Sequence, residues 1–258
     1  MCQSLFVVTL YSQMSVGADG CHETHYYNMI LRKSYMRIGI IVAMESELKL
    51  LIPLIDGIEE RVVSGTVFYE GKVGDHEVSV MQCGIGKVNA AMGAMKLINN
   101  FSPQCVINSG VAGGTGAGAK VLDVVAGERV GYHDVWCGSP NEPGQVQGLP
   151  RYFRADEGLL ALLPEGKVKR GLIASGDMFV DSVEELNRIK SIYPDSIAVD
   201  MESAAIAQVC HSYNIPFLSL RVVSDTPGET DNAAQYHNFW QEAPQCTFEI
   251  IKEFISKM

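Results

Sequence analysis

Basic residues, paired cysteines and long apolar runs are all scarce in this sequence, and each shortage argues against a class of protein. Twenty Lys and Arg stand against 30 Asp and Glu, which gives a formal net charge of −10. That charge repels phosphate backbones and anionic lipid headgroups, so it argues against a general nucleic-acid or membrane-surface binder. A membrane-spanning helix needs about 20 apolar residues in a row. The sequence contains no such run.

The seven cysteines show no CxxC spacing, and several lie inside apolar runs. An odd number of cysteines without paired spacing is typical of buried, reduced thiols in a cytoplasmic protein, rather than of a disulfide framework or a zinc site. We therefore expect no metal and no cofactor. Glycine, by contrast, is abundant: the 25 glycines cluster between apolar runs. This pattern favours an α/β enzyme with tight turns around a ligand.

Length and composition predict one large domain that follows a short extension. The chain has 258 residues, 47% of them hydrophobic, and no Pro- or Ser-rich linker. A single core accommodates this length. The early apolar run Ser4 to Leu10 has no Lys or Arg before it, which argues against a secretory signal. We predict that residues 1–35 are a disordered or spurious N-terminal extension and that residues 36–258 form the functional domain.

From residue 36 onward, apolar runs alternate with segments of helical periodicity. Strands are expected at 37–43, 66–73, 76–83, 105–108, 121–130, 170–175, 197–200 and 217–224, and helices at 45–55, 87–101, 182–192, 202–213 and 235–258. The two-residue connection Gly74-Asp75 predicts a hairpin. Alternating strands and helices predict a mostly parallel sheet covered on both faces, with ligands at the carboxyl ends of the strands.

Carboxylates follow three of the predicted strands. Glu45 and Glu47 come directly after the first strand, Asp200 and Glu202 mark the end of a later one, and Asp225 follows the last. The preference of acids for helix N-termini would explain one such site alone. Because the carboxyl ends of parallel strands meet at one edge of a sheet, three acidic strand ends predict a shared cleft.

Two glycine-rich segments, 83–87 and 109–116, join these strand ends, and both predict tight turns. Neither matches a dinucleotide-binding fingerprint or a P-loop, because the first lacks a third glycine and the second lacks a Gly-Lys-Ser/Thr ending. A generic NAD-binding domain is therefore disfavoured. Phe179 follows another predicted strand. Taken alone, one aromatic residue there is more often part of the core than a platform for a base.

Six motifs in order resemble those of the 5'-methylthioadenosine/S-adenosylhomocysteine nucleosidases. They are Ile38-Gly39-Ile40-Ile41 with Ala43-Met44-Glu45 and Glu47, Gly84-Ile85-Gly86-Lys87-Val88, Gly110 to Gly114, Ser175-Gly176-Asp177 with Phe179, Val199 to Glu202 with Ala204, and Arg221 with Ser224-Asp225. The resemblance spans Met36 to the C-terminus. It implies a three-layer α/β/α sandwich of the nucleoside phosphorylase type and a homodimer. It also implies hydrolysis of an N-glycosidic bond, with release of adenine and a 5-thio-substituted ribose.

The resemblance further implies a role for each matching residue. Glu47 would activate water, Asp225 would protonate the leaving adenine, and Glu202 would hold the ribose hydroxyls. The other implied substrate contacts are Met201 under the sugar, Phe179 and Val180 at the adenine, Gly113 in the second glycine-rich segment, Met44, Ile85 and either Tyr236 or Phe239 around the 5'-thio group, and Arg221 as a polar support beside the carboxylates.

The chemistry of purine–ribose bond cleavage requires an acid and a base in the same roles, independently of the family resemblance. Positive charge develops on the sugar and negative charge on the base, so an acid must meet the base while a carboxylate activates water on the opposite side. Glu47 and Asp225 can supply these roles. A protonated Asp225 would offer one donor and one acceptor, which match N7 and the N6 amino group of adenine. The apolar, polarizable Met44, Ile85 and Met201 suit a thioether better than a charged phosphate.

Two other functions remain open: a nucleoside phosphorylase on the same fold, and a nucleoside-binding domain without catalysis. The three intact carboxylates favour an enzyme over a binding domain. Related phosphorylases carry Arg and Ser where this chain has Asn108 and Val111, and Glu47 would repel phosphate. Water is therefore the expected nucleophile. The nucleosidase family commonly has Ser at Val111 and Glu at Asp200. We expect the missing hydroxyl to slow turnover or move the water, and Asp200 to be structural.

Overall fold

The computed structural model describes residues 35–116, 118–227, 236, 239 and 244–258, with side chains in the last segment from residue 250 onward. The chain divides into the units Met1–Arg32 and Lys33–Met258, and all the described residues belong to the second. The predicted extension lies outside them except for Tyr35, so its boundary stays a prediction. None of the described helices is long and apolar enough to cross a membrane.

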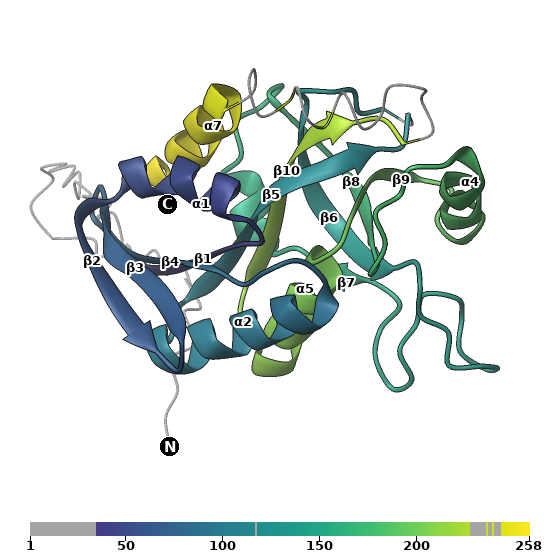
Figure 1. Ribbon diagram of the computed structural model, residues 1–258, viewed down its shortest axis with the longest axis horizontal. Coiled ribbons are helices and arrows are strands. Elements are labelled where there is room, and N and C mark those ends of the chain that lie inside the picture. The colour runs from purple at the N-terminus through teal and green to yellow at the C-terminus, as the bar shows by residue number, and fades with distance from the viewer. Residues whose placement is uncertain (1–34, 117, 228–235, 237–238, 240–243) are drawn as a thin grey trace, which may run out of the picture. The chain divides into compact units, whose positions relative to one another are not determined.

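One large mixed sheet runs through the second unit (Figure 1). Its strands are β1 (Arg37–Val42), β2 (Asp56–Val63), β3 (Thr66–Val73), β4 (His76–Gln82), β5 (Cys105–Gly114), β6 (Val124–Tyr132), β7 (Phe153–Arg154), β8 (Val168–Ser175), β9 (Ser196–Asp200) and β10 (Phe217–Asp225). Their order is β10-β6-β8-β9-β5-β1-β4-β3-β2, with β7 paired to β6.

Among the described strands, this sheet contains parallel and antiparallel pairs in equal number. Strand β1 runs parallel to β4 and β5, β5 runs parallel to β10, and β8 runs parallel to β6 and β9. The remaining pairs, β2–β3, β3–β4, β10–β6, β5–β9 and β6–β7, are antiparallel. The prediction of a mostly parallel sheet is therefore wrong, because tight hairpins extend one edge and antiparallel pairs join the two halves. The predicted hairpin at Gly74-Asp75 is confirmed, since Val73 pairs with His76.

Five strands close into a ring, because β10 pairs with both β6 and β5 while β9 pairs with both β8 and β5. The β5–β9 contact is short: Gly113 lies opposite Val199 and Gly114 opposite Ala198. A Cβ on Gly113 would come 2.9 Å from Pro227 and 3.1 Å from Val199. The segment 109–116 was predicted as a turn, but it is strand to Gly114, and glycine there permits close approach of neighbouring chains.

The helices are α1 (Glu45–Leu51), α2 (Lys87–Phe101), α3 (Glu157–Ala161), α4 (Val183–Ile192), α5 (Ser203–Tyr213) and α7 (Pro244–Ser256), with a 3₁₀ turn at Ile52–Leu54. Helices α2 and α5 lie together on one side of the sheet, and α1 and α7 on the other (Figure 1). Strand β1 shows the two layers: Ile38 and Ile40 join the core beneath α1 and α7, whereas Ile41 joins the core beneath α2 and α5. The predicted three-layer α/β/α sandwich is confirmed.

Local signals explain most of the helix boundaries. Helix α2 has its predicted bounds because Gly86, at φ +92°, precedes it and Ser102, in the left-handed conformation, ends it. Helix α4 begins where the Ser182 hydroxyl accepts a hydrogen bond from the backbone N–H of Glu185. Helix α1 is shorter than predicted, since it gives way to the 3₁₀ turn that contains Pro53.

Candidate active site

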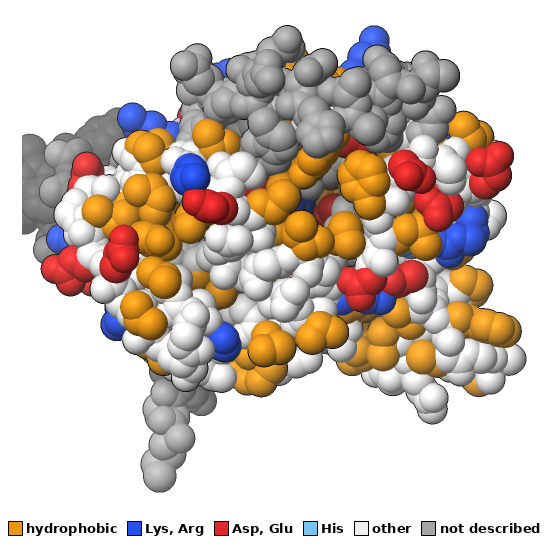
Figure 2. Space-filling view, viewed as in Figure 1, with side chains coloured by type: hydrophobic (Ala, Val, Ile, Leu, Met, Phe, Trp, Pro, Cys, Tyr) orange, Lys and Arg blue, Asp and Glu red, His pale blue; other side chains and the backbone are white. Residues whose placement is uncertain are grey.

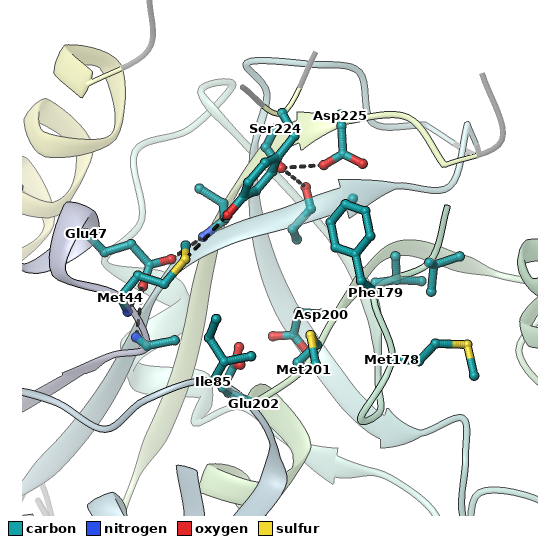
Figure 3. A pocket seen from close by; sticks show the side chains of 17 residues that line it. Met44, Glu47, Ile85, Met178, Phe179, Asp200, Met201, Glu202, Ser224 and Asp225 are labelled. Atoms are coloured by element: carbon teal, nitrogen blue, oxygen red, sulfur yellow. Dashed lines mark hydrogen bonds between the residues drawn. The ribbon is translucent and has the colours of Figure 1, made fainter. Parts of the chain in front are cut away.

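A pocket lies at the ends of strands β1, β5, β9 and β10 (Figure 3). It gathers residues from segments far apart in the sequence. Ten of the eleven predicted site residues line it: Met44, Glu47, Ile85, Gly113, Phe179, Val180, Met201, Glu202, Asp225 and Tyr236. Arg221 does not line the pocket but lies buried beneath it. Because residues at the carboxyl ends of β1, β5, β9 and β10 line one pocket, these strand ends form the predicted shared cleft.

Glu47, in the first turn of α1, is held by backbone donors. Its Oε2 accepts hydrogen bonds from the N–H groups of Ala43 (2.8 Å) and Met44 (2.9 Å), and its Oε1 accepts one from Val111 (3.0 Å). The side chain is 5% exposed. Burial raises the pKa of Glu47, although the Arg221 charge and the three N–H groups act in the opposite direction. The carboxyl group is therefore fixed where β1 meets β5.

Gly110 makes room for this arrangement. A Cβ at this position would lie 2.5 Å from Glu47 Oε1 and would clash with Nη1 of Arg221. Arg221 pairs with Gly110 across the β5–β10 ladder, so both charged side chains pass over the same glycine. No larger residue fits here without moving one of them.

Glu202 directly precedes α5 on the floor of the pocket. Its Oε1 accepts a hydrogen bond from the N–H of Gly86 (3.0 Å), and its Oε2 lies 3.5 Å from Arg221 Nη2. Burial, together with the charges of Asp200 and Glu47, raises the pKa of Glu202 to about 7, while Arg221 and the Gly86 N–H oppose the shift. This carboxyl group is therefore able to change its charge near neutral pH.

Arg221 makes its closest contacts to residues that the sequence analysis did not assign to the site. Nη2 lies 2.6 Å from Asp200 Oδ2 and also donates to Asn108 Oδ1. Asp200 in turn accepts hydrogen bonds from the hydroxyl groups of Ser175 and Ser203. Ser175 and Asp200 end apolar strands and Asn108 lies within one, and these positions were the available signal, because buried polar side chains there must find partners.

Asp225 enters from the other side of the pocket. Figure 3 shows Glu47 and Asp225 on opposite sides, with Asp200, Met201 and Glu202 between them. The β5–β10 register shifts between Val223 and Asp225, an irregularity that re-aims the last side chains of the strand. Asp225 is 2% exposed, and its Oδ1 accepts a hydrogen bond from the Ser224 hydroxyl at 2.5 Å.

Aromatic and thioether groups form the outer wall. The rings of Phe179 and Tyr236 meet edge to face with centroids 5.8 Å apart, and the Tyr236 hydroxyl donates to the sulfur of Met44 (3.4 Å). Of the two aromatic residues left open by the sequence, Tyr236 lines the pocket, whereas Phe239 packs in a buried cluster with Val222. Most of the neighbouring segment, 231–238, lies outside the described residues.

Val111 contributes both an apolar side chain to the pocket and its N–H to Glu47. The absence of a hydroxyl at this position is thus compatible with a correctly held Glu47. Among the described residues, no three His, Cys, Asp or Glu side chains come together as a group that could hold a metal ion.

The sequence profile of the phosphorylase superfamily matches residues 37–256. The 5'-methylthioadenosine/S-adenosylhomocysteine nucleosidase of Bacillus thuringiensis (strain Al Hakam) is 40% identical over 225 residues, which cover 84% of this chain and 97% of the relative. That of Desulfotalea psychrophila is 36% identical over 230 residues, with coverages of 86% and 98%. The S-adenosylhomocysteine nucleosidase of Streptococcus pyogenes, solved in complex with 5-methylthiotubericidin, superposes with a TM-score of 0.83 at 35% identity and covers 87% of this chain and 98% of its own. The chain therefore belongs to the phosphorylase superfamily and, within it, to the 5'-methylthioadenosine/S-adenosylhomocysteine nucleosidases.

Proposed function

We propose that this protein hydrolyses the N-glycosidic bond of 5'-methylthioadenosine and S-adenosylhomocysteine, and releases adenine and a 5-thio-substituted ribose. The observation that carries the proposal is the placement of Glu47 and Asp225 on opposite sides of one pocket, with Glu202 between them. The names of the relatives, and the methylthio-substituted nucleoside analogue bound to one of them, support it.

In the proposed mechanism, the carboxyl groups of Glu47 and Asp225 transfer the protons. Glu47 takes a proton from water as the water attacks the anomeric carbon, and Asp225 gives one to N7 of the leaving adenine. Three N–H groups occupy part of the acceptor capacity of Glu47, and one lone pair of Oε1 remains for the water. No metal or cofactor is needed, because water is the nucleophile and side chains carry the protons.

The remaining residues bind the substrate in this proposal. Glu202 holds the ribose hydroxyls and stabilises the positive charge on the sugar, and Met201 packs beneath the ring. Phe179 stacks on adenine while Met44 and Tyr236 surround the 5'-thio group. The other predicted contacts, Val180 at the adenine, Gly113 and Ile85, line the same pocket, and Arg221 supports the carboxylates from beneath.

A specific contact disfavours the phosphorylase alternative. The N–H of Val111, a donor that could otherwise bind an anion, already donates to Glu47, and the carboxylate repels phosphate. Incubation with each nucleoside, with and without phosphate, followed by product identification, tests the proposal. We expect adenine and a free 5-substituted ribose at a rate that phosphate does not change. Ribose 1-phosphate as a product, or strict dependence on phosphate, would establish the phosphorylase instead.

We expect kcat/KM to fall as the pH drops below about 7. The pKa of Glu202 is raised to about 7, and burial also raises the pKa of Glu47. Both groups act as carboxylates, so acidification removes charges that the reaction needs. A profile of kcat/KM from about pH 5 to about 9 measures this limb, and Glu202→Gln should make it less steep. A flat profile on the acid side would contradict the assignment.

We further propose a homodimer that forms through the outer face of α2. Val88 (69% exposed), Met92 (52%) and Met95 (44%) recur every three or four residues, and Ile85 lies just before the helix. Figure 2 shows hydrophobic side chains across this part of the molecule. Such a row of large apolar side chains on a helix surface is typical of an interface. Ile85 also lines the pocket, so the interface would adjoin the site.

Met92→Lys is expected to convert the dimer to monomers, because it puts a charge into the centre of the apolar row. Light scattering coupled to size-exclusion chromatography measures the mass. Asn187→Lys adds the same charge to an exposed position on a different helix, α4, and should leave the dimer intact. A wild-type protein that is itself monomeric would refute the proposed interface.

We propose that residues 1–35 are dispensable for the reaction. The family match begins at residue 37, where β1 also begins. A chain that starts at Met36 should retain kcat/KM and Tm nearly unchanged, as measured by turnover and thermal unfolding. A large loss of either would show that the extension belongs to the functional unit.

A cytoplasmic location is the last part of the proposal. Four described cysteines carry free thiols, and two of them, Cys105 and Cys210, are buried. Reduced, buried thiols suit a reducing compartment. Cell fractionation with an antibody against this chain tests the location.

A further inference from the structure

Three buried carboxyl groups share one guanidinium beneath the pocket. Asp200, Glu202 and Glu47 all contribute to the electrostatic environment of Arg221, which is 1% exposed. One positive charge beside three buried carboxyl groups favours the uptake of a proton by one of them as the pH falls. The distribution of hydrogen-bond donors decides which one.

Asp200 has the most donors. Its two oxygens accept from the hydroxyls of Ser175 and Ser203, from the Ser203 N–H, and from Arg221 Nη2 at 2.6 Å. These four donors surround both oxygens of the side chain. Glu47 accepts three backbone N–H groups. Both groups are therefore well provided with hydrogen-bond donors.

Glu202 has the fewest donors. It accepts the Gly86 N–H at 3.0 Å, and its Oε2 lies 3.5 Å from the same Nη2 that Asp200 holds at 2.6 Å. The charged groups that face Glu202 are Arg221 from β10, Asp200 from β9 and Glu47 from α1. The nearer carboxylate, helped by Asn108, thus keeps the Nη2 end of the cation away from Glu202.

We propose that Asp200 is a positioning residue: by holding Nη2 of Arg221, it leaves Glu202 as the carboxyl group that carries the exchangeable proton of the empty pocket. This inference rests on the proposed function for its importance, because Glu202 is there the group that faces the ribose. It assigns to Asp200 an electrostatic task in place of the structural one expected from the sequence. The proton enters from solvent and returns to solvent, and no other bond changes.

The titration of Glu202 in the substrate-free protein tests this inference. Protein labelled with ¹³C at the glutamate carboxyl carbons gives a Glu202 signal that is identified by its loss in Glu202→Gln. In the wild type we expect a midpoint at about 7. In Asp200→Asn, Nη2 of Arg221 is free to turn to Glu202, so the midpoint should fall by about one pH unit or more. An unchanged midpoint in Asp200→Asn overturns the proposal.

A matched variant separates this role from simple loosening of the cluster. Ser219→Ala removes the hydroxyl that lies 2.7 Å from Ser203 Oγ in the same buried cluster, but it changes no charge. The Glu202 midpoint should stay at its wild-type value in this variant. If Ser219→Ala moves the midpoint as far as Asp200→Asn does, Asp200 acts only as a structural residue and the proposal fails.

Two further measurements complete the test. The acid limb of the kcat/KM profile should move to lower pH in Asp200→Asn, in parallel with the NMR midpoint. If Asp200→Asn does not fold, the wild type alone still decides: a Glu202 signal that stays that of a carboxylate down to about pH 5 overturns the proposal. The titration needs no substrate, so its result is independent of whether the products are those of a nucleosidase.

Discussion

Asp225→Asn is expected to lower kcat by about 100-fold or more, because the amide keeps the shape of the side chain but has no proton to transfer to N7. The amide still offers a donor and an acceptor to adenine, so KM should change much less than kcat. Steady-state kinetics with 5'-methylthioadenosine measures both constants. Calorimetric measurement of adenine binding is the control that shows whether the pocket is intact. Near-normal turnover by this variant would remove Asp225 from the mechanism.

Glu47→Gln is expected to reduce kcat to a similar degree, by about 100-fold or more, since a neutral amide cannot take a proton from water. The amide nitrogen would also face one of the three N–H groups that now donate to the carboxylate, so a modest fall in Tm should accompany the loss.

Glu45→Gln is the matched control for this change. Glu45 lies two residues away on the same helix, forms an exposed pair with Lys49 at 2.7 Å, and does not line the pocket. Its replacement should leave kcat unchanged. If Glu47→Gln retained the kcat of this control, water activation would have to be assigned elsewhere.

The sequence predicted those elements whose signals are local. Helix α2 and strand β3 have their predicted bounds, because turns and a helix stop signal flank them. Strand β2 was missed, since it is a largely exposed edge strand with the acidic sequence Asp56-Gly57-Ile58-Glu59-Glu60 and so shows no apolar alternation. Strand β7 was also missed, because its two residues, Phe153 and Arg154, are too few to show an alternating pattern.

The site was predictable to the extent that strand ends predict where side chains meet. Of the acids after β1, β9 and β10, Glu47, Asp200, Glu202 and Asp225 line one pocket, whereas Glu45 is exposed and pairs with Lys49. The partners of those acids were not predictable, because they depend on register: Arg221 meets Gly110, and through it Glu47, only because β10 lies beside β5 in that alignment. The choice between Tyr236 and Phe239 likewise needed the direction of each side chain.

The short contact between β5 and β9 has a consequence for ligand binding. The ring of strands is closed there by the Gly113–Val199 and Gly114–Ala198 pairs and by two hydrogen bonds from Thr115 to the carbonyl groups of Ser196 and Ile197. Gly113, Val199 and Met201 also line the pocket. A nucleoside in the pocket would therefore contact both β5 and β9 and bridge the two strands. Because a ligand stabilises whichever conformation binds it, occupation of the pocket and closure of the ring are thermodynamically linked. Bound substrate would therefore hold β5 and β9 together, and after release of the last product only the few β5–β9 hydrogen bonds would remain to do so.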